Sequence, residues 1–182
     1  QTFSLGISLL EKAASTGSPT RINYLAVRYL DNPLFPESFS RGIELLKRSA
    51  EQYNSAEGQA IWGICCFLNQ DFYQAIYYLE RSSRPSAKYI LAGIYLGDSP
   101  ELSDYQKGMD YLKFAADNGE DSAQFFLSCC YLRQKLTSEA FKFLTLASKC
   151  NSSSSVLLFC LYTAGIFPQK GLEKSLKFLQ LS

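Results

Sequence analysis

Histidine is absent from all 182 residues of the chain, and methionine and tryptophan occur once each. The lack of histidine removes the side chain that most often serves as a general base and the commonest zinc ligand. Long apolar runs are absent too, so no segment predicts a membrane-spanning helix. The chain opens on Gln1 and shows no signal-peptide pattern, so we expect a processed chain or a fragment of a longer one.

Net charge is also nearly absent. The 18 basic and 17 acidic residues give a net charge of +1 and are spread along the chain. No basic stripe is available for a phosphate backbone or an anionic bilayer, so we expect neither nucleic-acid binding nor membrane insertion. Lys47 with Arg48, and Lys170 with Lys174 and Lys177, lie at helical spacing beside polar residues, which predicts a solvated outer face rather than a phosphate site.

Cysteine is present six times, at Cys65, Cys66, Cys129, Cys130, Cys150 and Cys160. Four of these form adjacent pairs inside apolar helical patterns, where they behave as small buried hydrophobic residues. We interpret the cysteines as reduced, which favours the cytoplasm, with the nucleus as an alternative. A bridge between Cys150 and Cys160 stays open, and a lumenal or secreted location would follow from oxidised cysteines. We see no metal-ligand set and expect no cofactor.

A repeat of 32 to 36 residues organises the chain. Its first block holds a small residue, an anchor leucine four positions on and two small residues beyond, and its anchors are Leu10, Leu46, Leu79, Leu112, Leu144 and Leu179. A second block lies between successive copies and places a bulky residue four positions before a tyrosine or its substitute. These last positions are Tyr29, Cys66, Tyr95, Tyr131 and Tyr162. Both blocks have helical spacing, so each unit is predicted to be an antiparallel helix hairpin.

Turn residues fall where hairpins should break, at Gly17-Ser18-Pro19, Asn54-Ser55, Arg84-Pro85-Ser86, Asn118-Gly119 and the run from Ser152 to Ser155. Ser86 and Ser122 are candidate helix caps, and Asn118-Gly119 is typical of a left-handed helix stop. Glu120-Asp121 should begin a helix and favour the positive end of its dipole. The distance from the tyrosine position of each second block to the next anchor leucine alternates between 17 and 13 residues along the chain. Two classes of loop are therefore expected inside the hairpins.

These residues resemble the Sel1-like repeat family, which is related to tetratricopeptide repeats. The best-matching stretch runs from Ala87 to Gly119 and is carried by Ala87, Leu91, Ala92, Tyr95, Gly97, Leu112, Ala115, Ala116 and Gly119. Cys66 in a tyrosine position and Phe159 in a small position depart from the pattern. The resemblance implies an all-α fold, a right-handed α/α superhelix (solenoid) of about five hairpins, with first helices lining a concave face and second helices forming the outer wall.

We expect one solenoid over residues 1–182, with units at 1–18 (partial), 19–54, 55–84, 85–119, 120–151 and 152–182. Projection of the first helices predicts a concave, mostly apolar partner-binding face. Its residues are Asn23, Val27, Ala60, Ile64, Tyr89, Phe125, Cys129, Leu132 and Arg133. In the alternative arrangement, neighbouring second helices cover these side chains.

Three functions are compared. The resemblance implies a non-catalytic adaptor or scaffold that holds a peptide or helix of a partner protein. A permanently incorporated structural subunit of a large complex is the first alternative. The second is a hydrolase acting on β-lactams, as proposed for secreted cysteine-rich relatives. The chain has no Ser-x-x-Lys motif, no Gly-x-Ser-x-Gly elbow and no histidine to activate a cysteine, so we expect that it is not an enzyme.

Overall fold

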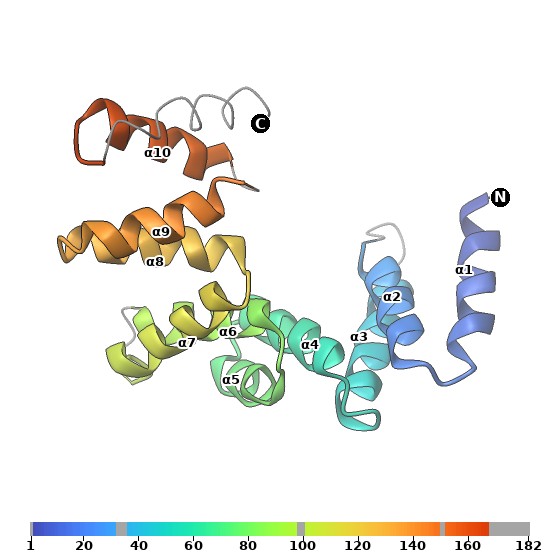
Figure 1. Cartoon of the computed structure of the whole chain (residues 1–182). Coiled ribbons are helices and arrows are strands. Elements are labelled where there is room, and N and C mark those ends of the chain that lie inside the picture. Colours follow the sequence, from blue (N-terminus) through green and yellow to red (C-terminus); the bar gives the residue numbers. More distant parts are fainter. Residues whose placement is uncertain (1, 32–35, 98–100, 150–151, 168–182) are drawn as a thin grey trace. The chain divides into compact units, whose positions relative to one another are not determined.

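The protein is described by a computed structural model that covers residues 2–31, 36–97, 101–149 and 152–167 (Figure 1). These residues form helices and turns and contain no strand, which confirms the all-α prediction. The helices are α1 (Thr2–Ala14), α2 (Pro19–Leu30), α3 (Pro36–Glu51), α4 (Ala56–Leu68), α5 (Phe72–Arg81), α6 (Pro85–Leu96), α7 (Tyr105–Asp117), α8 (Asp121–Arg133), α9 (Thr137–Ala147) and α10 (Ser152–Thr163).

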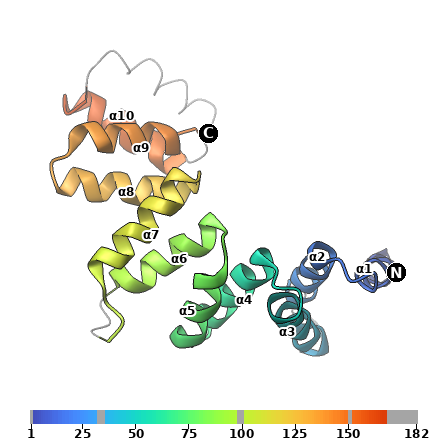
Figure 2. The same ribbon diagram turned by 60° about the horizontal axis from the view of Figure 1, so that its bottom comes forward.

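The contacts of the chain divide it into two compact units, Gln1–Leu91 and Ala92–Ser182, with the boundary inside α6. In the first unit, α1 packs on α2, α2 on α3, α3 on α4 and α4 on α5, and the two first helices α2 and α4 also touch. In the second unit, α7 packs on α8, α8 on α9 and α9 on α10. The last three lie side by side in Figure 1 and again in Figure 2.

Anchor leucines form the buried layer between paired helices. Leu46, Leu79, Leu112 and Leu144 have no exposed surface. The side chain of Leu10 and the whole of the sixth copy around Leu179 lie outside the described residues. Burial of an aliphatic side chain of this size contributes roughly 1.5–3 kcal/mol of folding free energy, so the anchor positions stabilise each hairpin.

Small residues let the paired helices approach closely. A Cβ atom added to Gly63 of α4 would lie 2.7 Å from Cγ of Leu79 on α5, and one added to Gly108 of α7 would lie 2.7 Å from Cγ of Leu96 on α6. Both distances are too short for carbon atoms, so these helix pairs require glycine. The small positions in the repeat thus set the spacing within the hairpins.

Two loop classes are present inside the hairpins. Only three residues connect α4 to α5 and α8 to α9, whereas five or more separate α2 from α3 and α6 from α7. Each short connection has a left-handed residue in its middle, Gln70 (φ 63°) or Lys135 (φ 61°). The chain then turns within one residue, and the amides that follow bond to carbonyls of the preceding helix. The predicted alternation of loop lengths is confirmed for the four hairpins from α2 to α9, and the fifth interval extends into residues outside the described ranges.

The helix-boundary predictions divide into correct and wrong ones. Gly119 has a φ of 87° and ends α7, as expected, and Asp121 lies in the first turn of α8. The capping roles predicted for Ser86 and Ser122 are wrong, because each serine lies one residue inside its helix. Pro85 has its φ pre-set for the first helical position and so starts α6 earlier than a serine cap would. Glu120 precedes α8 without a side-chain cap bond.

Candidate protein-binding surface

The first unit contains five of the nine residues predicted for the partner-binding face. Val27 of α2, Ile64 of α4 and Tyr89 of α6 are half-buried, so part of each side chain reaches solvent. Asn23 and Ala60 are buried, at 2% and 4% exposure. These two residues therefore contribute little exposed surface to the predicted face.

Asn23 connects α2 to the start of α4. Its side-chain amide donates to the Ser55 hydroxyl and to a Glu57 carboxylate oxygen, both at 3.4 Å. Ser55 in turn accepts the Gly58 amide at 3.2 Å as the cap of α4. The buried carbonyl oxygen of Asn23 has no hydrogen-bond partner. The amide therefore fixes two successive first helices beside each other.

The second unit contains the other four predicted residues, all on α8. Phe125, Cys129 and Leu132 are half-buried, and Arg133 is exposed. Phe125 and Leu132 pack against a core cluster built from Leu144 of α9 together with Leu158 and Tyr162 of α10. Neighbouring helices therefore cover part of these side chains and leave the rest accessible.

The most exposed aromatic residues of the first helices lie one position further along the chain than predicted. Tyr24 of α2 is 50% exposed and Phe126 of α8 is 44% exposed. A one-residue step rotates a side chain by about 100° around the helix, so sequence projection missed them. A signal was available, because this position is large and apolar in every first helix. The residues at this position, called the apolar row below, are Tyr24, Ile61 and Ile90 in the first unit and Phe126 and Leu157 in the second.

Tyr24 is held in place by charged neighbours on its own helix. The Arg28 guanidinium lies 5.0 Å from the centre of the Tyr24 ring and donates to its hydroxyl at 3.3 Å. Asp31 lies 3.9 Å from Arg28. An aromatic ring fixed by a cation in this way presents a rigid amphipathic surface, of the kind enriched at the centres of protein interfaces.

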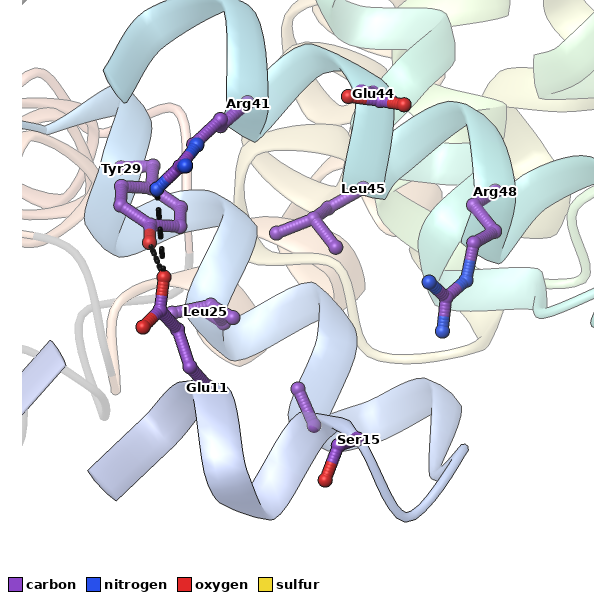
Figure 3. Close-up of a pocket in the computed structure, with 9 residues that line it drawn as sticks. Glu11, Ser15, Leu25, Tyr29, Arg41, Glu44, Leu45 and Arg48 are labelled. Carbon is purple, nitrogen blue, oxygen red and sulfur yellow. Dashed lines mark hydrogen bonds and ion pairs between the residues drawn. The ribbon is translucent and has the colours of Figure 1, made fainter. Parts of the chain in front are cut away.

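A cavity of about 360 Å³ opens between α1, α2 and α3 (Figure 3). The Tyr29 hydroxyl donates to a Glu11 carboxylate oxygen, and Arg41 lies 3.6 Å from the same oxygen. Burial of Tyr29 and its bond to Glu11 raise the pKa of this phenol. The hydroxyl therefore stays protonated near neutral pH, and the cluster closes one side of the cavity.

Among the described cysteines, Cys66 is buried, Cys65, Cys129 and Cys130 are half-buried, and Cys160 is exposed. Burial raises the pKa of the thiols of Cys65, Cys129 and Cys130, and it raises that of Cys66 to about 11. None of the five cysteines in the described segments forms a disulfide; Cys150 lies outside them. Within the same segments, no group of three or more cysteine, aspartate or glutamate residues could hold a metal ion.

Of the two basic clusters predicted to lie on a solvated outer face, only the one at Lys47 and Arg48 lies in the described residues. Lys47 is exposed with its ammonium 5.0 Å from the Trp62 ring centre, and Arg48 is half-buried beside Tyr53. Lys170, Lys174 and Lys177 lie outside the described residues. Across the described part of the chain, no helix combines the length and the hydropathy needed to cross a bilayer.

Comparison with known proteins places this architecture. A family model described as Sel1 repeat matches residues 23–54, 61–84, 85–120 and 121–152, which together make up more than half of the chain. No curated protein sequence matches the chain significantly.

Two solved structures are similar in fold. A protective antigen present in uropathogenic Escherichia coli strains, which displays an SLR fold, shares 19% sequence identity with a TM-score of 0.73. The match covers 87% of this chain and 36% of the antigen, so the chain spans about a third of that protein. A Sel1 repeat protein from Oxalobacter formigenes also shares 19% identity, with a TM-score of 0.79, over 96% of this chain and 74% of the other. Both matches confirm the α/α solenoid class predicted from the repeat.

Proposed function

The chain belongs to the Sel1 repeat family, whose repeats are commonly protein-interaction scaffolds, and from this premise we propose that it is a non-catalytic adaptor. It binds a peptide or helix of a partner protein along its first helices. The observation that carries the proposal is the apolar row, in which Tyr24 of the first unit and Phe126 of the second are large and about half exposed. Exposed aromatic residues flanked by polar ones are typical of protein interfaces.

The half-buried side chains of Val27, Ile64, Cys129 and Leu132, with Tyr89 and Phe125, would extend the binding face beside the apolar row. Contact between α2 and α4 brings two first helices together and supports a shared surface in the first unit. Exposed Arg133 would lie at the rim of the corresponding surface in the second unit. The partner is therefore expected to insert apolar side chains and to place polar groups at the edges.

A non-catalytic role is supported by the side chains available for chemistry. The sequence has no histidine to act as a general base, and four of the thiols have raised pKa values. A thiol with a raised pKa is mostly protonated near pH 7 and is a poor nucleophile. The Sel1 repeat fold is typically a scaffold of this non-catalytic kind.

We propose a reducing compartment, the cytoplasm, as the place where the adaptor works. Adjacent cysteine pairs at Cys65-Cys66 and Cys129-Cys130 lie in helices as separate thiols, and burial keeps them protonated. Reduced thiols of this kind are typical of the cytosol. The number of thiols in the purified protein tests this placement.

Affinity capture of partner proteins tests the adaptor role. Tyr24→Ala with Phe126→Ala should lose specific partners that the unchanged protein recovers, because each truncation at an interface anchor weakens binding by roughly 1–4 kcal/mol. The matched control is Phe39→Ala with Phe114→Ala, which truncates two exposed aromatic residues on the second helices α3 and α7. Recovery of the same partners by both double variants would contradict binding along the first helices.

A further inference from the structure

Three arginines of the first unit lie at two neighbouring turns. Arg48 of α3 donates to the Tyr53 hydroxyl at 3.5 Å, and Arg81 of α5 donates to the side-chain oxygen of Asn54 at 3.2 Å. Tyr53 and Asn54 are consecutive residues in the turn between α3 and α4. Two guanidinium groups from different helices are therefore held at one turn.

The turn between α1 and α2 adjoins this site. The Tyr53 hydroxyl lies 3.4 Å from the position that a Cβ atom on Gly17 would occupy. In the same turn, Arg21 donates to the Thr16 hydroxyl at 3.2 Å. Arg81 also donates to the hydroxyl of Tyr77, at 3.4 Å, with its guanidinium 5.4 Å from the ring centre. We call Arg21, Arg48, Tyr53, Tyr77 and Arg81 the turn-edge surface.

The turn-edge surface carries three positive charges, and Glu44, Glu51 and Glu80 lie near Arg48 and Arg81 in the sequence. Among the described residues, none of its three arginines lies within ion-pair distance of a carboxylate, whereas Arg28 and Arg41 each do. The nearby Glu51 carboxylate accepts the Tyr78 hydroxyl at 2.7 Å. Each guanidinium has five N–H donors, and the contacts described above use only one or two of them. The remaining donors are available for an anionic ligand.

A cavity with both apolar and charged lining adjoins this charge; Ala14, Leu25 and Leu45 line it together with Glu11, Arg41, Glu44 and Arg48. Arg48 also lines the 360 Å³ cavity between α1, α2 and α3, together with Ser15. Figure 3 shows Arg48 and Ser15 on one side of the cavity and Glu11, Tyr29 and Arg41 on the other, with Leu25 and Leu45 between them. Glu44 lies at the rim. A volume of this size is at the lower end of the range for small-ligand pockets, about 300–1,000 Å³.

We propose that the turn-edge surface binds an acidic segment of a partner polypeptide, with one large aliphatic side chain of that segment in the cavity. Carboxylates of the ligand pair with Arg21, Arg48 and Arg81, and charge complementarity selects the segment. A polypeptide is favoured over RNA because one face of the Tyr53 ring and one of the Tyr77 ring are covered by Arg48 and Arg81. Bases could stack only on the opposite faces, so the surface offers RNA less stacking area than two free rings would.

Fluorescence anisotropy with a labelled Glu-Glu-Leu-Glu-Glu peptide tests the charge. Arg48→Gln with Arg81→Gln should weaken binding about tenfold, and added salt should weaken binding of the unchanged protein. The matched control is Lys113→Gln with Lys142→Gln, which removes the same charge at exposed positions outside the surface. Its affinity should stay within about twofold of the unchanged protein. Equal losses in both double variants would overturn the proposal, as would equal binding of a Gln-Gln-Leu-Gln-Gln peptide.

A second comparison tests whether the cavity between α1, α2 and α3 holds the aliphatic side chain of the ligand. The unchanged protein should prefer the leucine peptide over Glu-Glu-Ser-Glu-Glu by about fivefold to tenfold, since the leucine side chain leaves water. Ser15→Leu places an aliphatic group in the cavity from an exposed position and should abolish that preference while leaving binding of the serine peptide unchanged. A preference that survives Ser15→Leu would show that leucine binds elsewhere.

A charge-reversed variant distinguishes a specific loss of binding from unfolding of the protein. Arg48→Glu with Arg81→Glu should reject the acidic peptide and bind Lys-Lys-Leu-Lys-Lys, which an unfolded variant cannot do selectively. Circular dichroism should report unchanged helix content. Tighter binding of a labelled oligouridylate than of the acidic peptide, with the same dependence on Arg48 and Arg81, would assign the surface to RNA and overturn the proposal. The adaptor role along the first helices is judged separately, through Tyr24 and Phe126.

Discussion

Gln70 and Lys135 occupy backbone positions that glycine usually takes. Both have a φ near 60° at the middle of a three-residue turn, where a side chain costs about 1–2 kcal/mol relative to right-handed backbone. The amides of Asp71 and Leu136 bond back to carbonyls of Cys66 and Tyr131, at 3.0 and 2.9 Å, and this closure offsets part of the cost. Neither turn contains glycine or proline, so residue type alone does not predict their left-handed geometry.

Thiol reactivity is the prediction that belongs to single residues. Burial raises the pKa of the Cys66 thiol to about 11, so only about one thousandth of it is thiolate at pH 8. In the folded protein the exposed Cys160 should react with a thiol reagent at pH 8 before Cys65, Cys66, Cys129 and Cys130 do. After unfolding in the absence of reductant, six thiols per chain should titrate.

Two results of that titration would contradict the reduced and buried state of the cysteines. A count of four after unfolding would reveal one disulfide, with Cys150 and Cys160 the candidate pair, and would contradict the proposed reducing compartment. Rapid reaction of Cys66 in the folded state would contradict its burial.

Two glycines, Gly63 and Gly93, have opposite effects on the stability of the helices that contain them. Gly63 lies where α4 meets α5, and its missing side chain leaves room for the fully buried Leu79. Gly93 lies on the exposed side of α6, where an added Cβ would meet no atom within 4 Å. The same residue type therefore makes a close helix contact possible in one element and only loosens the backbone in the other.

Alanine substitution separates these two cases. Gly63→Ala should destabilise the protein by about 1–3 kcal/mol, because its Cβ would lie 2.7 Å from Cγ and 3.2 Å from the backbone nitrogen of Leu79. Gly93→Ala should stabilise it by about 0.5–1 kcal/mol through helix propensity. Urea unfolding followed by circular dichroism measures both. A neutral or stabilising effect of Gly63→Ala would show that helix spacing does not depend on Gly63.

At the scale of the whole molecule, the contacts between neighbouring hairpins contribute to the stability of each hairpin. In repeat proteins each unit contacts mainly the next one, so a local defect has its largest effect nearby. The contacts of this chain separate into two compact units, and its single tryptophan, Trp62, lies in the first of them. Tryptophan fluorescence therefore reports on the first unit, while circular dichroism reports on all helices.

Truncation of one anchor leucine in each unit tests this independence. Leu46→Ala and Leu144→Ala should each cost about 2–5 kcal/mol, because both side chains are fully buried. Leu46→Ala should lower the urea midpoint measured by Trp62 fluorescence. Leu144→Ala should lower the midpoint measured by circular dichroism and leave the fluorescence midpoint nearly unchanged. Identical shifts in both signals for both variants would show instead that the molecule unfolds as one cooperative body.

Much of the fold follows from the sequence. The spacing of the anchor leucines predicts the hairpins, and the alternating interval predicts the two loop classes, because helix periodicity and chain length are local properties. The cap predictions at Ser86 and Ser122 failed for a local reason: the helix starts differ by one residue from the serine positions. The extent of a single continuous solenoid and the role of the nine predicted face residues stay predictions.

Only the tertiary structure decided which neighbouring positions reach solvent. Asn23 and Tyr24 are adjacent in sequence, yet Asn23 is buried against Ser55 and Glu57 whereas the side chain of Tyr24 is exposed. The turn-edge surface likewise depends on Arg48 of α3 and Arg81 of α5 meeting at one turn. A repeat pattern in the sequence gives the periodicity along one helix. Contacts between side chains of different helices depend on the rotation of each helix and on the distance between helices, which are fixed only when the hairpins pack.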